Sequence, residues 1–358
     1  MLQVVNRTLP ACLIAVDANC LMPLAAAERT FTVAHSYRRW MQKELPRHLE
    51  QPPDDNPLDG RSTRSLPVLD NLPREISERW PAANIEALLS EDGLQDLPID
   101  HSVGNGAIAG GPVAAAKLLK QFVTQRLGDY DASRNEPDEF GSSELSPHLH
   151  FGHIGPHEIF FQVMQAAGWN PSKLHKPNGK VNGFWGVDAN TEAFLDQLCT
   201  WREIGFNMCW RESNYTELTS LPDWAQQTIA AHADDKRPIV YSLTELEQAE
   251  THDEIWNAAQ RQLVREGRIH NYLRMLWGKK ILQWTRSAED ALRIMIELNN
   301  KYGLDGRDPN SYSGIFWVLG RYDRAWGPER EIFGKIRYMT SENTAKKHAL
   351  KNYLKRFK

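Results

Sequence analysis

The sequence predicts a mainly α-helical protein, and three observations lead to this expectation. Through residues 251–308, apolar side chains recur three and four positions apart, which is the spacing of one buried helix face. Helical patterns also occupy residues 26–49, 112–130 and 194–207. Only residues 11–18, ACLIAVDA, have the continuous apolar character of a buried strand, and a lone strand cannot bury itself without a sheet. We therefore expect helices to form the core.

Residues 251–308 are expected to fold as three consecutive helices. Thr251 and Glu254 have the Ser/Thr-x-x-Glu spacing of a reciprocal cap at the start of the first helix. Ser287 is expected to cap the third helix, and Gly303 to close it in a left-handed conformation.

Length and composition allow a sizeable core, in one large domain or two smaller ones. The 358 residues are 41% hydrophobic, which is ordinary for a globular protein. The four cysteines, Cys12, Cys20, Cys199 and Cys209, have no metal-ligand spacing, and we interpret them as reduced thiols of a cytoplasmic protein. No apolar run approaches the ~20 residues needed to span a bilayer. We expect no membrane partner, and a monomer.

The charge distribution is uneven along the chain. A formal net charge of −4 argues against a generic nucleic-acid binder. From Gly334 to the end, however, eight lysines and arginines face one acidic residue, Glu342. Such a basic end can meet phosphates, and it can equally be a solvated helix face or a frayed tail.

Residues 51–75 are crowded with proline, aspartate and glycine and are typical of a linker on the surface. The glycines of residues 101–111 superficially suggest a dinucleotide-binding loop. No strong strand precedes them, and no distinctive acidic residue follows at the required distance. We expect Gly110, Gly111 and Pro112 to begin a helix instead.

Residues 130–163 form a polar loop that leads into a helix. Hydroxyls and free amides ahead of a helix N-terminus suit a diphosphate, although a turn-rich surface loop uses the same residue types. His148, His150, His153 and His157 lie in this segment without any recognised metal-ligand spacing, so no metal is expected.

Three tryptophans, Trp256, Trp277 and Trp284, punctuate the helical stretch described first. Trp277 and Trp284 are seven positions apart, which places them on one helix face roughly 10 Å apart along the axis. Indoles at such separations can pass an electron by hopping. Core packing uses the same spacing.

Several ordered blocks of sequence match a known family. They are YDASRNEP, LSPHLHFG, FLDQLCTWRE, WNAAQRQL, HNYLRMLWGKKILQWT, LNNKYGLDGRDPNSYSGIFW and RAWGPEREIFGKIRYM. The chain thereby resembles the photolyase/cryptochrome family, most closely the class II cyclobutane pyrimidine dimer photolyases. The resemblance implies a helical FAD-binding domain over residues 101–358, a linker over 51–100, and a truncated remnant of an N-terminal α/β antenna-type domain over 1–50. We expect no antenna chromophore.

The resemblance also implies which residues bind a non-covalent FAD. These are Tyr130, Ser142, Ser143, Leu145, Ser146, Arg202, Asn207, Asn257, Arg274, Asp305 and Asp308. Arg274 opposite Asp305 is expected to form a buried ion pair, which needs further hydrogen bonds to offset its desolvation. Asn299 matches the residue that faces flavin N5.

On the DNA side, Trp201, Met275 and Trp317 match residues that contact the pyrimidine dimer, and Arg134 matches one that fills the opening left by a flipped lesion. The family has a catalytic glutamate where this chain has Gln197. Glutamine can donate a neutral hydrogen bond but cannot supply a proton or take a charge, so we expect weaker repair chemistry.

The implied function is light-driven repair of DNA containing pyrimidine dimers, by electron transfer from reduced FAD. This is the activity of a deoxyribodipyrimidine photo-lyase, a carbon–carbon lyase. The resemblance also assigns photoreduction to Trp277, Trp256 and Trp284, in that order outward from the flavin. Two alternatives remain: a cryptochrome-like blue-light photoreceptor, which Gln197 favours, and a flavin-free nucleic-acid-binding remnant.

Overall fold

The computed structural model describes residues 7, 12–14, 16–50, 59–60, 73–90, 93–104 and 106–358. The chain divides into two compact units, one comprising Met1–Gln51 with Gly106–Lys358 and the other Pro52–Asn105. In the smaller unit, which nearly coincides with the expected linker, the described residues form two short helices, α3 (Arg74–Arg79) and α4 (Ile85–Leu88), whose side chains are all exposed.

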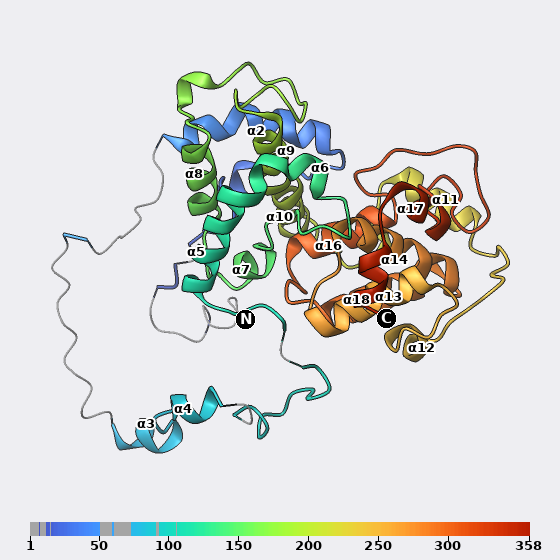
Figure 1. The fold of residues 1–358 in the computed structure, drawn as a ribbon, viewed down its shortest axis with the longest axis horizontal. Helices are drawn as coiled ribbons and strands as arrows, with labels where there is room; N and C mark the ends of the chain where they lie inside the picture. The colour runs from blue at the N-terminus through green and yellow to red at the C-terminus, as the bar shows by residue number, and fades with distance from the viewer. Residues whose placement is uncertain are drawn as a thin grey trace. The chain divides into compact units, whose positions relative to one another are not determined.

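The larger unit is helical, as predicted (Figure 1). Its α-helices are α2 (Ala34–Leu49), α5 (Pro112–Gln121), α6 (Tyr130–Ser133), α7 (Ser146–His150), α8 (Pro156–Ala166), α9 (Ala189–Leu195), α10 (Arg202–Arg211), α11 (Asp223–Ala231), α12 (Leu243–Glu247), α13 (Glu254–Glu266), α14 (Asn271–Trp284), α15 (Ala288–Tyr302), α16 (Pro309–Val318), α17 (Ser341–Lys347) and α18 (Lys351–Arg356). Short 3-10 turns are η1 (Leu24–Ala26), η3 (Leu127–Asp129), η4 (Pro171–Lys173) and η6 (Leu218–Ser220). Among the described residues, β pairing is limited to an isolated bridge between Arg330 and Gly334. Within the same residues, no helix combines the length and the apolar composition needed to cross a membrane.

Two π-helical turns interrupt the helices, η2 (Phe122–Arg126) and η5 (Asp196–Trp201). The second one joins α9 to α10, so that residues 189–211 form one continuous helical rod with a widened turn at its centre. α10 packs against α16, and α14 packs against α13, α15 and α16. These helices bring the middle and the end of the sequence together.

The expected strand at residues 11–18 is wrong. Residues 12–14 and 16–18 contain no strand, and Ile14 and Val16 are 77% and 82% exposed; residues 11 and 15 lie outside the described part. The physical reason is that no other described strand offers a partner to the backbone amides and carbonyls of this segment.

Residues 20–49 pack onto the helical unit. The buried carboxylate of Glu203 accepts a hydrogen bond from Leu21 N (2.7 Å) and one from the Tyr37 hydroxyl (3.5 Å). Phe31 N donates to Asn207 Oδ1 (3.0 Å), and α2 packs on η5. The N-terminal segment is therefore part of the framework around η5.

Glu203 gives this junction a pH dependence. Removal from water raises the pKa of its carboxyl to about 7, and the hydrogen bond from Leu21 N opposes this shift. Because the unfolded carboxyl titrates near 4.5, the folded state binds more protons between pH 4.5 and 7, and stability must fall as pH rises through this window. The shift corresponds to an effect on the order of 3 kcal/mol.

We expect Glu203→Gln, which retains an oxygen for Leu21 N, to remove this slope. The measurement is the free energy of unfolding in urea at intervals from pH 4.5 to 7.5, for wild type and variant. Other titrating groups are common to both proteins and cancel in the difference. A difference that stays constant across the window would show that Glu203 does not titrate there.

The helix ends of residues 251–308 follow the expectations in part. Ser287 caps α15 by accepting from Asp290 N (3.0 Å), as predicted. The cap of α13 is Asp253, whose Oδ1 accepts from Ile255 N (3.1 Å) and Trp256 N (3.0 Å), because its short charged side chain lies at the first exposed amides. The expected Thr251 cap is therefore wrong.

The left-handed cap lies at the end of α13 and not at Gly303. Gly303 has φ −69°, so the expected left-handed conformation is wrong; its amide simply continues the helical bonding to Asn299 O (2.8 Å). Gly267 has φ 70° and ends α13 with a bond from its amide to Leu263 O (2.9 Å). Glycine adopts this conformation without a steric penalty. At Gly111 and Pro112, α5 begins as predicted.

Candidate functional site

Three adjoining cavities lie in the larger unit. The first has a volume of about 770 Å³, the second about 310 Å³ and the third about 120 Å³. Arg134, Asn271 and Arg274 line both the first and the second, and Gln197 lines both the first and the third. Asn310 lines all three. The cavities therefore form one connected site, and the volumes of the first two are each in the range of ligand-binding pockets.

The second and third cavities gather most of the residues expected to bind the cofactor. Ser142, Ser143, Leu145, Ser146, Arg274 and Asp305 line the second, and Tyr130, Ser143, Leu145, Ser146, Arg202 and Asp308 line the third. α7 begins at Ser146, and the Ser146 hydroxyl donates to Asp305 Oδ2. Arg274 Nη2 lies 3.5 Å from Asp305 Oδ1, with the two side chains 18% and 11% exposed. The expected ion pair is thus present, only partly shielded from water, and its carboxylate has a second partner.

The donor set in these cavities fits a molecule that combines a flat ring, hydroxyls and phosphates, as FAD does. Arg202 is buried, and its Nη1 has no hydrogen-bond partner among the described residues. A buried N–H donor without a partner costs free energy until an acceptor meets it. Apolar side chains on the third cavity, Phe194, Leu198 and Ile159, complete a surface for a ring.

Two of the residues expected to bind the cofactor form hydrogen bonds to neighbouring loops. Asn207 donates to Arg29 O (3.0 Å) and accepts from Phe31 N, and it lines none of the three cavities. The side chain of Asn257 donates to Thr251 O (2.8 Å) and accepts from the Thr251 hydroxyl (2.8 Å), also away from the cavities. Asn299 is buried, donates to Asn300 Oδ1 (3.3 Å) and likewise lines none of them.

Asn271, Asn310 and His270 line the site without having been expected there. Asn310 follows Asp308, the N-cap of α16, and its position in the first helical turn was its only signal in the sequence. His270 lines the second cavity, where burial lowers its pKa to about 4, so it is a neutral imidazole at ordinary pH. A single buried histidine leaves no pattern in the sequence.

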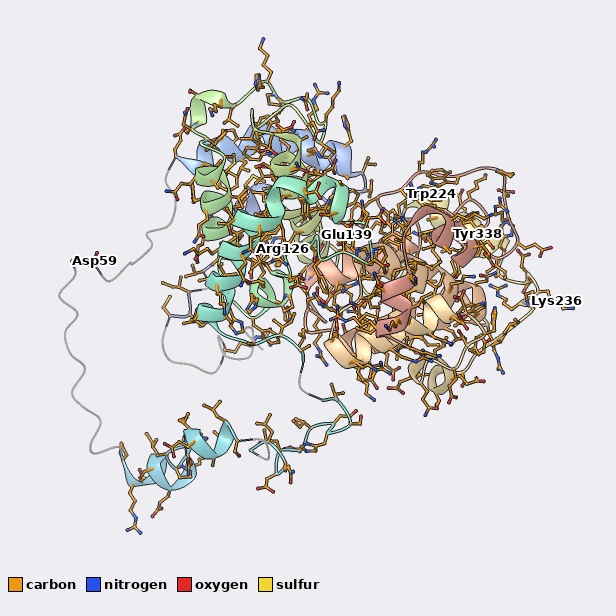
Figure 2. The ribbon with its side chains drawn as sticks, viewed as in Figure 1. Asp59, Arg126, Glu139, Trp224, Lys236 and Tyr338 are labelled. Atoms are coloured by element: carbon orange, nitrogen blue, oxygen red, sulfur yellow. The ribbon has the colours of Figure 1, made fainter. Side chains whose placement is uncertain are left out.

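The first cavity is aromatic and positively charged. It is lined by Trp201, Met275, Trp317 and Arg134, the residues that the resemblance assigns to the lesion. The guanidinium carbon of Arg337 is 5.3 Å from the ring centroid of Trp317 and 4.3 Å from that of Trp326. Tyr338, labelled in Figure 2, is also part of the lining. Aromatic faces flanked by cations suit a nucleobase with its phosphates.

Three basic side chains of the C-terminal segment reach the site, Arg337 and two others. Lys347 lines the first cavity and Arg356 the second. Arg356 Nη2 also pairs with Glu266 Oε1 (2.5 Å). The remainder of the lysines in α17 and α18 are exposed, as a solvated face requires.

Gln197 lies at the junction of the first and third cavities, half-buried within the π-helical turn η5. Trp201 ends the same turn, and its Nε1 donates to Asp196 Oδ2 (3.1 Å). A π-helical turn places its side chains at angles that an α-helix does not provide, and such turns often occur at functional sites.

The three tryptophans of α13 and α14 form a connected buried series. Trp277 Nε1 donates to Gln260 Oε1 (2.9 Å), and Trp256 Nε1 donates to the carbonyl of Trp277 (3.0 Å). The rings of Trp256 and Trp284 have centroids 5.7 Å apart. Trp284 in turn contacts Tyr241, whose centroid is 5.5 Å away and which is only half-buried. The series leads from the core towards the surface.

Three of the histidines of residues 148–157 have close polar neighbours. His148 Nδ1 and His153 Nδ1 are 3.2 Å apart, and His150 Nδ1 is 3.2 Å from Asp308 Oδ2. Within the described ranges, no three His, Cys, Asp or Glu side chains are grouped so that they could hold a metal ion.

Comparisons with curated proteins find relatives that share one name. The chain is 36% identical over 268 residues to the deoxyribodipyrimidine photo-lyase of Methanothermobacter thermautotrophicus, covering 75% of this chain and 55% of the relative. It is 39% identical over 290 residues to that of Potorous tridactylus (78% and 51% covered) and 32% identical over 367 residues to that of Arabidopsis thaliana (98% and 66%). The chain spans about half the length of the first two relatives. No protein-family model matches it.

Solved structures show the likeness of the fold. A class III photolyase from Agrobacterium tumefaciens matches with a TM-score of 0.51 and 22% identity, over 70% of this chain and 45% of that one. A cryptochrome from Synechocystis matches with a TM-score of 0.51 and 17% identity, over 72% and 47%.

Proposed function

The chain belongs to the photolyase/cryptochrome family, and on this basis we propose that it binds FAD and repairs cyclobutane pyrimidine dimers in DNA under light. One observation carries the proposal. A connected site has phosphate-binding residue types at one end, a cavity lined by Trp201 and Trp317 at the other, and Gln197 between them.

In this proposal the second and third cavities hold the cofactor. Ser142, Ser143 and Ser146 supply hydroxyls at the start of α7, and Arg202 supplies an unpaired guanidinium donor. Arg274 and Asp305 present a donor and an acceptor to the edge of a ring, and Tyr130 and Leu145 pack around it. When bound, FAD supplies light absorption and the transferable electron. Asn299, buried in α15, donates to Asn300 Oδ1 (3.3 Å), and the same oxygen accepts from Arg307 N (2.9 Å), so Asn299 supports the loop that contains Arg307.

The first cavity receives the lesion. A base inside a duplex cannot reach a buried cofactor, and a damaged pair costs less to extrude than an intact one. Trp201, Trp317 and Met275 offer apolar faces to the extruded dimer. Arg134 is the cation at the rim of the cavity that can enter the duplex. It is half-buried, and its Nε lies 3.6 Å from Asp131 Oδ1. Gln197 faces both the dimer and the cofactor and donates a neutral hydrogen bond.

A blue-light photoreceptor of the cryptochrome type is the second candidate, and Gln197 is the observation that favours it. A neutral amide cannot take up or supply a proton when charge arrives on the dimer. In a photoreceptor this step does not occur, so nothing selects a carboxyl group at this position.

The test uses the full chain, loaded with FAD and reduced, and a duplex that contains one thymine dimer. We expect the protein to take up FAD, and light to restore the intact thymines. A duplex with a (6-4) photoproduct controls for the class of lesion. FAD uptake without any repair of bound dimer DNA would replace repair with the photoreceptor. A chain that never takes up FAD would contradict both.

A further inference from the structure

A buried ion pair connects the N-terminal helix α2 to the π-helical turn η5. Arg38 Nε lies 2.6 Å from Asp196 Oδ1, and Arg38 Nη2 lies 3.0 Å from Asp196 Oδ2. The two residues are 7% and 6% exposed. This is the two-pronged geometry in which a guanidinium group fixes the plane of a carboxylate, which a lysine cannot reproduce.

The same carboxylate holds an indole of the site. Asp196 Oδ2 accepts a second hydrogen bond from Trp201 Nε1 (3.1 Å), and Trp201 lines the first cavity beside Gln197. Tryptophan N–H is a donor only, and rotation of the ring about its bond to Cβ moves this donor away from the acceptor. The carboxylate therefore selects one orientation of the ring.

Packing explains why an arginine is buried here. The inner face of α2 carries Tyr37, Met41 and Leu45 at helical spacing, and Arg38 and Gln42 lie on the same face one turn apart. Both polar side chains also bind the loop at Gly179: Arg38 Nη1 donates to Gly179 O (3.1 Å), and Gln42 Oε1 accepts from Gly179 N (2.8 Å). Of these two side chains, only Arg38 also binds Asp196.

We propose that Arg38 is a positioning residue for the lesion cavity, acting through Asp196 to hold the indole of Trp201 in the orientation that receives an extruded pyrimidine dimer. This inference rests on the proposed function. It gives the N-terminal segment, 163 positions before Trp201 in the chain, a part in substrate recognition. The residue touches neither dimer nor cofactor.

The expected consequence is a change in affinity without a change in the cofactor. In Arg38→Lys, the Asp196 carboxylate loses its two-pronged contact with a guanidinium group. The Trp201 ring is then free to rotate and must be immobilised when the dimer binds. We expect the dissociation constant for dimer-containing duplex, measured in the dark on FAD-loaded protein, to rise about five- to tenfold, as when one free side chain must be ordered on binding. The FAD spectrum and FAD affinity should remain those of wild type.

Two controls separate positioning from a general effect on folding. Gln42→Ala removes the neighbouring contact to the same loop without touching Asp196, and it should leave the affinity for dimer DNA unchanged. In a Trp201→Phe background no indole N–H remains to be oriented, so adding Arg38→Lys should have no further effect. An equal loss in both backgrounds would overturn the proposal.

A second measurement does not depend on repair or on DNA. In protein labelled with ¹⁵N at the indole nitrogens, the Trp201 resonance is identified by its loss in Trp201→Phe. Arg38→Lys, and separately Asp196→Asn, should shift this resonance and speed its hydrogen exchange, whereas Gln42→Ala should not. If wild type fails to distinguish dimer DNA, the proposed function fails while this measurement still decides the role of Arg38. An unmoved Trp201 resonance in both variants would refute that role.

Discussion

Trp277→Phe should stop light-driven reduction of bound FAD while FAD remains bound. Trp277 is buried in α14, and its backbone carbonyl accepts a hydrogen bond from Trp256 Nε1. The ring centroids of Trp256 and Trp284 are 5.7 Å apart. Phenylalanine is far harder to oxidise than tryptophan, so the first step of the series is lost. We expect the photoreduction rate to fall by more than about tenfold, which requires a barrier increase of only ~1.4 kcal/mol.

The substitution has a structural cost that must be kept apart from this effect. Without the indole N–H, Gln260 Oε1 loses its donor inside the core, and a smaller ring leaves a void; together these cost roughly 1–3 kcal/mol of stability. Trp185→Phe is a matched control, because Trp185 is equally buried and packs against Phe160 and Phe184 in another part of the core.

The measurement is the bleaching of oxidised flavin absorbance under blue light with an external reductant. Trp277→Phe should bleach slowly and Trp185→Phe at the wild-type rate. If Trp277→Phe bleaches at the wild-type rate, the three tryptophans are core residues and carry no electrons. This result would leave the FAD site and the repair proposal standing.

How far the sequence could predict the site depended on the kind of pattern each part left. The helices of residues 251–308 follow from apolar periodicity, and the loop that begins α7 was recognisable as a polar stretch before a helix. Both signals are local, because each depends on residues within a few positions of one another.

The sequence did not show which of two neighbouring side chains caps a helix. Thr251 and Asp253 both offer an oxygen near the start of α13; Asp253 reaches the free amides, and the Thr251 hydroxyl bonds Asn257 instead. As a result, the Asn257 side chain is bonded to Thr251 in this structure. The outcome depends on the position of each oxygen in space, which residue order does not contain.

Two features of the tertiary geometry, the π-helical turn η5 and the partner of Arg38, were not predicted from the sequence. A π-helical turn adds one residue to a helical turn, and nothing in residues 196–201 marks the insertion. The orientation of Gln197 towards two cavities follows from this turn. In the same way, an arginine on an otherwise apolar face of α2 signals a buried partner, but only the fold shows that the partner is Asp196.

Gln197→Glu should increase the repair of dimers per absorbed photon. Gln197 lines the wall shared by the cavity for the dimer and the cavity for the cofactor. A hydrogen bond that involves a charged group exceeds a neutral one by roughly 1 kcal/mol, so we expect a gain of about fivefold in yield. The carboxyl group can also exchange a proton as charge arrives.

Binding of damaged DNA should change little, because Trp201, Trp317 and Met275 supply most of the apolar surface of the cavity. Gln197→Met serves as the control of equal length, since it retains packing and removes the hydrogen bond; its yield should fall below that of wild type. Arg202 lines the third cavity with an unpaired Nη1, and a new carboxylate there can pair with it. Such pairing would stabilise the folded protein and raise the midpoint of thermal unfolding.

The decisive measurement is light-dependent dimer reversal at saturating damaged duplex with fully reduced FAD, so that affinity and redox state do not enter. If wild type repairs as well as Gln197→Glu, the neutral amide suffices and our account of this residue is wrong, although the repair function stands. If both proteins bind the duplex and neither repairs it, the missing carboxyl group is not the cause. The site then belongs to a photoreceptor, in which the tryptophan series and the FAD cavity are retained for signalling and not for transfer of an electron to DNA.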